Sequence, residues 1–243
     1  VAPMGKGAAG HYVKMIHNGI EYALMQMLAE CYDLMRRRLG MTNAEMAAEF
    51  ARWNDGRLQG FLVAITVTVL GTPDPLGAGE LIDAVSDQAR AKGTGKWTSQ
   101  EAMDLGVPVP AIDAAVSARE LSALRAERLQ LAALYPGLPA ARADRAAALA
   151  GLEQAYFAAA WIAYAQGFAQ IGAASREYGF GTELATVARV WRAGCIIRAA
   201  ILEPIHAAFA ANPALANLLL EPGVAAALAP AVAGLRATVI DGV

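Results

Sequence analysis

Residues 10–22 read GHYVKMIHNGIEY, and they open the stretch that decides the fold. From there, apolar residues recur every three or four positions: Val13, Ile16, Ile20, Leu24, Met27, Leu28, Cys31, Leu34 and Met35. This period is typical of an α-helix that buries one face. Gly40 then provides the residue type that most often follows the end of a helix. The sequence therefore predicts one long helix from Val13 to Leu39.

The same period continues along the chain and predicts an all-α fold. Thr42 with Glu45 three residues later is a capping-box pattern that begins the next helix. Phe61–Leu70 has strand-like composition, but its neighbours are helical, so we expect 53–70 to form one helix. Further helices are expected at 78–91, 98–105, 110–134, 143–177, 182–202, 205–211, 213–220 and 224–238. Residues 92–96 are expected to form a polar loop and Pro136–Pro139 a linker.

The sequence contains no alternation of strands and helices and no G-x-G-x-x-G motif between a strand and a helix. We therefore expect no dinucleotide-binding fold within the chain. Two stretches resemble each other, and together they predict a single domain, 1–243, built as a duplicated multi-helix bundle with repeats at about 11–135 and 143–243. The matching pieces are Ile20–Ala23, Leu39-Gly40 and Trp53–Gly56 in one copy, and Ile162–Ala165, Tyr178-Gly179 and Trp191–Gly194 in the other. Coincidence between two helical, alanine-rich stretches is the alternative.

Composition limits the classes of function. Hydrophobic residues make up 56% of the chain and charged residues 17%, against about 45–50% and about 25% in average domains. The formal net charge of -2 argues against nucleic-acid binding, which needs a basic surface. An anionic substrate would therefore need a local cluster of cations. The two cysteines, Cys31 and Cys195, are expected to be buried free thiols in a cytoplasmic protein.

One uncharged segment, Ala155–Ala174, is long enough to span a bilayer. Gln166 and Gln170 interrupt it, and a helix buried inside a bundle is equally apolar on all sides. No signal-peptide pattern opens the sequence. We therefore expect a buried helix and no membrane association, with a small membrane protein as the alternative.

Four polar residues share one face of the first predicted helix. Lys14, His17, Asn18 and Glu21 are spaced i, i+3, i+4 and i+7, which aligns them in one stripe. A solvated helix face would look similar. However, Asn18-Gly19 is unfavourable inside a helix, which suggests a reason other than stability. The stripe is therefore a candidate functional site.

The sequence of this stripe, GHYVKMIHNGIEY, resembles the signature helix of the 6-phosphogluconate dehydrogenases. Residues 92–98, KGTGKWT, are similar to a characteristic loop of that family. Further matches follow in the family's order: Ala118-Arg119 with Glu127-Arg128, Tyr164–Phe168, and Trp191-Arg192 with Gly194–Arg198. The wider group of β-hydroxyacid dehydrogenases matches only the lysine and the asparagine. The chain is thus similar to the family's all-helical C-terminal domain, without its N-terminal Rossmann domain and its C-terminal tail.

This resemblance implies roles in the oxidative decarboxylation of 6-phosphogluconate to ribulose 5-phosphate. Lys14 would be the general base that removes the proton of the 3-hydroxyl, for which its amine must be neutral. Glu21 would be the acid that protonates the enediol carbon. His17 and Asn18 would bind the carboxylate and hydroxyls of the substrate.

The resemblance also implies a phosphate site and partners. Tyr22, Lys92, Thr94 and Arg119 would bind the phosphate, and Ile196 would offer a backbone contact. NADP would be bound mainly by the missing domain, a homodimer is expected, and no metal is expected. Leu24 departs from the family, which commonly has an acidic residue there. We expect the isolated chain to lack dehydrogenase activity, and the alternative is an inactive helical dimerisation module that kept only the fold.

Overall fold

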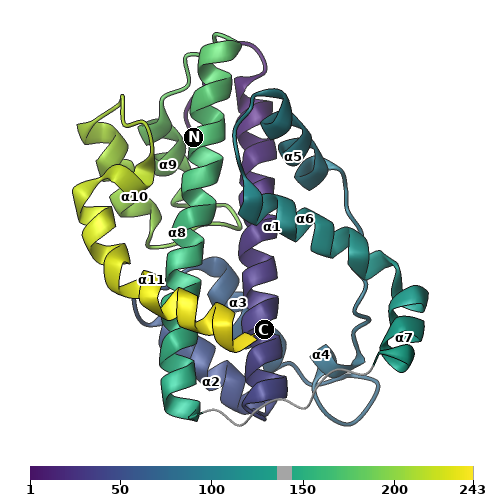
Figure 1. Ribbon diagram of the computed structural model, residues 1–243. Helices are drawn as coiled ribbons and strands as arrows, with labels where there is room; N and C mark the ends of the chain where they lie inside the picture. The colour runs from purple at the N-terminus through teal and green to yellow at the C-terminus, as the bar shows by residue number, and fades with distance from the viewer. Residues whose placement is uncertain (136–143, 243) are drawn as a thin grey trace.

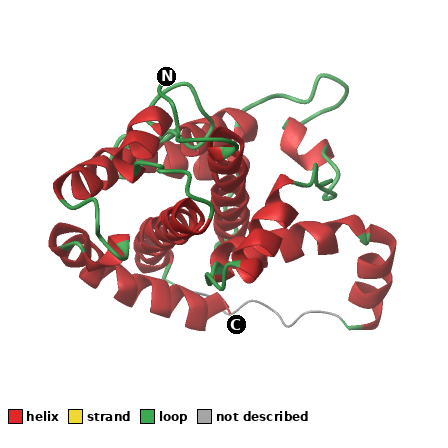
Figure 2. Ribbon diagram, turned by 90° about the horizontal axis from the view of Figure 1, so that it is seen from above, coloured by secondary structure: helices red, strands yellow, loops and turns green. Residues whose placement is uncertain are grey.

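The computed structural model describes residues 1–135 and 144–242, and these form an all-α bundle, as predicted (Figure 1). Figure 2 shows the described part as helices joined by loops, and it contains no strand beyond two isolated bridge pairs. The helices are α1 Ala9–Asp33, α2 Asn43–Asn54, α3 Phe61–Leu70, α4 Leu81–Ala84, α5 Thr94–Asp104, α6 Pro110–Ala123, α7 Arg125–Leu134, α8 Arg145–Glu177, α9 Leu184–Trp191, α10 Leu202–Ala211 and α11 Pro222–Gly242. A π-helical turn, Leu34–Arg38, extends α1, and a 3-10 turn covers Leu218–Leu220.

Two long helices, α1 and α8, lie side by side through the middle of the bundle (Figure 1). They approach closely at Gly167, where an added Cβ would lie only 2.5 Å from Cδ1 of Ile20. Tyr164 and Phe168 flank this glycine and are 1% exposed. The middle of α8 is therefore buried in the core, which confirms the prediction that Ala155–Ala174 is a buried helix.

The most exposed long apolar helix is instead α11, which crosses α8 and packs against it (Figure 1). Among the described residues, 222–240 is the stretch that is long and apolar enough to cross a membrane, and 17% of it is buried. A single helix of this kind is weak evidence for a membrane span, because length and composition alone do not separate a span from a surface that another protein covers.

The prediction of one helix over 53–70 is wrong. Helix α2 ends at Asn54, whose side-chain oxygen accepts a hydrogen bond from the amide of Gly60 at 3.0 Å. The amide of Phe61, the first residue of α3, donates to the carbonyl of Arg198 at 3.0 Å. Long-range backbone bonding to residues 198–200 therefore breaks a segment whose local pattern is helical. The capping box of Thr42 and Glu45 at the start of α2 is confirmed.

Other predicted boundaries also moved. The helix at 78–91 is reduced to α4, since the backbone after it bonds to the end of α6. The helix at 110–134 divides at Leu124, whose ψ of 44° is not helical. The helix at 182–202 stops at Trp191, and Gly194 takes a φ of 70°.

Three smaller differences concern helix ends. Helix α5 begins inside the segment expected to be a loop, α10 begins at Leu202, and only a 3-10 turn forms within 213–220. The first helix continues beyond α1 as the π-helical turn. The predicted linker Pro136–Pro139 lies outside the described residues. Both cysteines are free, as predicted, although Cys195 is only half-buried.

The two tryptophans of the proposed repeat each pack on the long helix of the other copy. Trp53 stacks on Tyr156 of α8, with ring centroids 5.9 Å apart. Trp191 meets His17 of α1 edge-on at 5.7 Å. These reciprocal contacts agree with a duplicated bundle, but the repeat itself stays a prediction.

Candidate active site

The polar stripe on α1 is a connected cluster of side chains. Nζ of Lys14 donates to Oδ1 of Asn18 at 2.7 Å and lies 3.3 Å from Nδ1 of His17. The same ring nitrogen lies 3.1 Å from Oδ1 of Asn18 and 3.7 Å from Oε2 of Glu21. Lys14 is exposed, whereas the side chain of His17 is 2% exposed and that of Glu21 is 18% exposed. The cluster therefore runs from an open cationic end toward a more enclosed carboxyl.

Helix α5 adds Thr94 to this cluster. Nδ2 of Asn18 donates to Oγ1 of Thr94 at 3.0 Å, which joins two segments that are far apart in the sequence. Two glycines allow this approach, because they leave room for side chains of the facing helix. An added Cβ would lie 2.6 Å from Cγ2 of Thr98 at Gly19, and 2.5 Å from the ring of Tyr22 at Gly95.

Thr98 was not predicted from its pattern to serve the site, but it ties the two helices together. Its hydroxyl lies 3.0 Å from the carbonyl of Met15 on α1 and 2.9 Å from that of Thr94 on its own helix. Its carbonyl accepts a hydrogen bond from the buried amide of Gln170 on α8 at 2.8 Å. The only sequence signal for this contact was its position at the end of the KGTGKWT motif.

Two of the predicted phosphate residues contact each other on α1 and α6. The guanidinium carbon of Arg119 lies 4.0 Å from the ring centroid of the buried Tyr22, a cation–π contact. Lys92 is exposed two residues before Thr94, and its side chain makes no hydrogen bond or ion pair with the described part of the chain. The structure thus brings Tyr22, Thr94 and Arg119 to the stripe and leaves Lys92 extending from the adjoining loop.

The segment between α9 and α10 brings Ile196 to the same region. The carbonyl of Ile197 accepts a hydrogen bond from the buried hydroxyl of Tyr164 at 2.5 Å, and Nη1 of Arg198 donates to the carbonyl of Cys195 at 2.7 Å. Burial raises the pKa of the Cys195 thiol, and the nearby charge of Lys14 acts against that rise. Trp191, which ends α9 just before this segment, meets His17 edge-on at 5.7 Å, so the segment begins beside the stripe.

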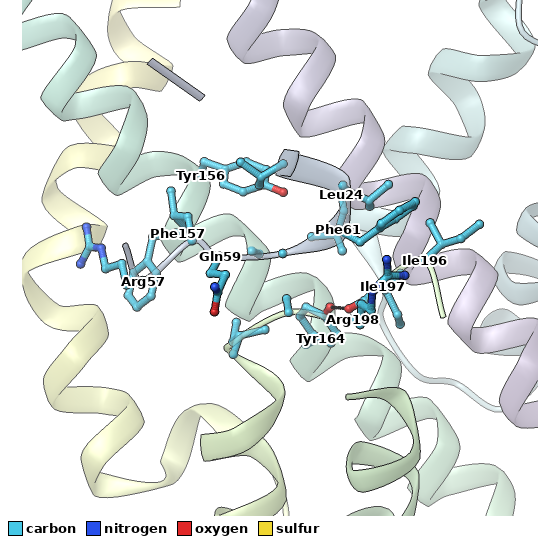
Figure 3. A pocket seen from close by; sticks show the side chains of 17 residues that line it. Leu24, Arg57, Gln59, Phe61, Tyr156, Phe157, Tyr164, Ile196, Ile197 and Arg198 are labelled. Atoms are coloured by element: carbon cyan, nitrogen blue, oxygen red, sulfur yellow. Dashed lines mark hydrogen bonds between the residues drawn. The ribbon is translucent and has the colours of Figure 1, made fainter. Parts of the chain in front are cut away.

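Ile196 and Leu24 both line an apolar hollow beside the stripe (Figure 3). Phe61, Tyr156 and Tyr164 complete much of its wall, so Leu24 faces hydrocarbon here. A carboxylate in place of Leu24 would lose hydration in this environment. The departure from the family at this position therefore fits its surroundings.

Burial gives the two titratable partners of Lys14 opposite shifts. The pKa of His17 falls to about 4, mainly because burial disfavours the imidazolium and then because Lys14 repels it. The pKa of Glu21 is raised by burial, while Lys14 and Arg119 act against the rise. At neutral pH the cluster therefore combines an amine, a neutral imidazole, and a carboxyl that accepts a proton more readily than an exposed one.

Taken together, the fold and this cluster define an all-α domain with a candidate acid–base site on its first helix. The family described as 6-phosphogluconate dehydrogenase, C-terminal domain, matches residues 10–243. The chain belongs to this family.

Known relatives carry the same domain within longer chains. Decarboxylating 6-phosphogluconate dehydrogenases from Lactococcus lactis (strain IL1403) and Escherichia coli (strain K12) are 47% and 44% identical, over 91% of this chain and 47% of their own length. A solved structure of Plasmodium falciparum 6-phosphogluconate dehydrogenase, a protein described with its cofactor NADP+ and with its substrate 6-phosphogluconate, superposes with a TM-score of 0.94 at 35% identity. The superposition covers 98% of this chain and 51% of the Plasmodium falciparum chain. The chain therefore spans about half the length of the relatives it matches.

Proposed function

We propose that this chain binds 6-phosphogluconate and supplies the acid–base groups for its oxidative decarboxylation to ribulose 5-phosphate in the pentose phosphate pathway. The observation that carries the proposal is the single cluster that Lys14, His17, Asn18 and Glu21 form on α1. The names of the relatives and the substrate of the Plasmodium falciparum protein support it. A module that served only dimerisation would have no need of this set.

The contacts suggest which end of the substrate lies where. The arginine fork of Arg119 and the positive charge of Lys92 suit a phosphate, and the ring of Tyr22 lies against the guanidinium of Arg119. Thr94 opens α5, so the free amides of that first turn add to the attraction for an anion. His17 and Asn18 would then hold the carboxylate and hydroxyls, and the backbone at Ile196 would border the sugar.

The two proton-transfer groups flank one small molecule. Lys14 and Glu21 are seven residues apart on one helix, a rise of about 11 Å. In its neutral form Lys14 takes the proton from the 3-hydroxyl as C3 is oxidised. It returns that proton to the ketone oxygen as the C1–C2 bond breaks and carbon dioxide leaves, which forms the enediol. Glu21, which burial makes easier to protonate, then donates a proton to C2 while the neutral Lys14 takes back the proton of the C3 hydroxyl, so that C3 becomes the ketone of the product.

NADP supplies the oxidant when bound, accepting hydride from C3. The described residues form no β-sheet, so nothing in them fits the nucleotide-binding fold such a cofactor requires. The nucleotide must therefore be held by a separate domain, and we propose that the isolated chain binds substrate without turning it over. We propose that the protein works in the cytoplasm, in keeping with its two free cysteines.

The test compares NADPH formation from 6-phosphogluconate by the complete protein and its variants. Lys14→Met and Glu21→Gln should each lower kcat by about 100-fold or more, the contribution expected of a positioned acid or base. Arg52→Ala on α2, far along the chain from the stripe, should leave kcat unchanged. Calorimetry should detect 6-phosphogluconate binding to the isolated chain. Full activity in the Lys14 variant, or a wild-type protein that does not bind the substrate, would refute the proposal.

A further inference from the structure

A set of hydrogen bonds fastens the non-helical segment 87–89 to the junction of α6 and α7. Oδ1 of Asp87 accepts from Nε of Arg125 at 2.9 Å, and its Oδ2 accepts from Nη1 of Arg128 at 2.9 Å. Nη2 of Arg128 donates to the carbonyl of Ser122 at 2.9 Å and lies 3.3 Å from that of Asp87. One guanidinium thus bridges the segment and the last turn of α6.

The hydroxyl of Ser122 connects the same segment to the turn that carries Arg119. It accepts a hydrogen bond from the amide of Ala89 at 3.0 Å and lies 2.7 Å from the carbonyl of Arg119. Nε2 of Gln88 adds a bond to the carbonyl of Ala123 at 3.2 Å. Every residue from 87 to 89 is therefore bonded to the C-terminal part of α6 or to α7.

This fastening fixes the loop that carries Lys92. Lys92 follows Ala89 by three residues, a reach of about 10 Å at most. It precedes Thr94 by two residues, and Thr94 is held by Asn18. The loop is therefore anchored on both sides, to the turn of Arg119 and to the polar stripe.

We propose that Asp87, Ser122 and Arg128 are positioning residues that hold Lys92 beside Arg119 so that both cations meet the phosphate of the substrate. The inference rests on the proposed function. None of the three touches the substrate. They act through the backbone of residues 89–92. Their loss should weaken binding of the phosphate and leave binding of the sugar unchanged.

A simpler explanation is that Arg128 only adds positive charge near an anion. The variant Asp87→Asn distinguishes positioning from long-range charge, because it removes a negative charge and keeps the shape of the side chain. If only long-range attraction matters, the variant should bind the phosphate more tightly. If Asp87 positions the loop, the variant should bind it more weakly. Ser122→Ala changes no charge and breaks the link to Ala89 directly.

The experiment measures, by calorimetry on the complete protein, the Kd of 6-phosphogluconate and of gluconate, which lacks the phosphate. Asp87→Asn and Ser122→Ala should each raise the Kd of 6-phosphogluconate about tenfold, as expected when one hydrogen bond to a charged group is weakened. The Kd of gluconate and the melting temperature should not change. Arg52→Ala is the matched control, since Arg52 bridges Glu49 and Glu153 in a comparable surface network.

Tighter or equal binding of 6-phosphogluconate by Asp87→Asn would overturn the proposal, as would an equal loss for both ligands. In either case the wild-type protein would still bind 6-phosphogluconate, and the proposed function would stand. A wild-type protein that bound 6-phosphogluconate no more tightly than gluconate would overturn this proposal alone, and one that did not bind 6-phosphogluconate would refute both.

Discussion

His17 and Glu21 are one helical turn apart, yet burial moves their protonation equilibria in opposite directions. The imidazole is kept neutral, and the carboxyl takes up a proton more easily than in water. Neighbouring groups whose pKa values are pushed apart are typical of acid–base sites. Here the separation leaves a neutral imidazole between the amine of Lys14 and the carboxyl of Glu21.

The lowered pKa of His17 makes the protein less stable in acid. The unfolded histidine has a pKa of about 6.5, so the unfolded state binds a proton below that pH. The folded state does not bind this proton until the pH falls to about 4. The free energy of unfolding should therefore decrease by up to about 3 kcal/mol as the pH is lowered from about 6.5 to about 4. His17→Asn should lack this part of the slope in urea unfolding at several pH values.

Glu21 acts against this slope, because a raised pKa makes the folded state bind protons more readily. The difference between wild type and variant isolates the contribution of His17. The control is His11→Asn, an exposed histidine on the same helix, which should retain the wild-type slope. Parallel pH profiles for wild type and His17→Asn would mean that the imidazole is not buried as described.

The spacing of the four stripe residues was enough to predict that they share a face, because helical geometry is local. It could not predict that Asn18 bonds Thr94 or that Arg119 covers Tyr22. Those contacts join distant segments, and no periodic pattern records them. The family resemblance supplied these residues, and Thr98 was missed because its hydroxyl bonds only backbone carbonyls.

At the scale of elements, the longest helices were the easiest to predict. Helices α1 and α8 keep their apolar period over many turns, and packing against each other reinforces it. The segments at 53–70 and 78–91 failed because their backbones bond to distant residues in preference to their own next turn. Local propensity is weak compared with such tertiary hydrogen bonds.

The crossing of α1 and α5 depends on the absence of a side chain at Gly19. Gly19→Ala would bring a methyl group to 2.6 Å from Cγ2 of Thr98, so the helices must separate. We expect the free energy of unfolding to decrease by about 1–3 kcal/mol, as at other overpacked sites. Substrate affinity should also fall, because Thr94 moves with α5. Urea unfolding and calorimetry measure the two effects.

Two further variants test this reading of the helix crossing. Gly10→Ala on the same helix meets nothing within 4 Å and should be neutral or stabilising by about 0.5–1 kcal/mol. Adding Thr98→Ser to Gly19→Ala removes the clashing methyl and should restore part of the stability. A Gly19→Ala protein as stable as wild type would contradict the close approach.

At the scale of the whole molecule, the apolar composition exceeds what the core uses. Helix α11 carries Val239 and Ile240 at 56% and 75% exposure, and α3 carries Ile65 and Val69 at 41% and 42%. Exposed apolar side chains on an ordered helix commonly mark an interface. A bilayer would cover the same helix, so the two possibilities must be separated in solution.

We expect the purified chain to be a homodimer without detergent, since a second copy can bury these helices by two-fold symmetry. Light scattering should give about twice the chain mass of 25.3 kDa. Val239→Glu with Ile240→Glu should shift the mass toward the monomer, because two carboxylates would lose hydration in an apolar contact. Leu76→Glu, at a loop residue that is 95% exposed, is the control and should leave the dimer intact. A wild-type chain that is monomeric at micromolar concentration would exclude this interface, and one that dissolves only with detergent would favour a membrane surface for α11.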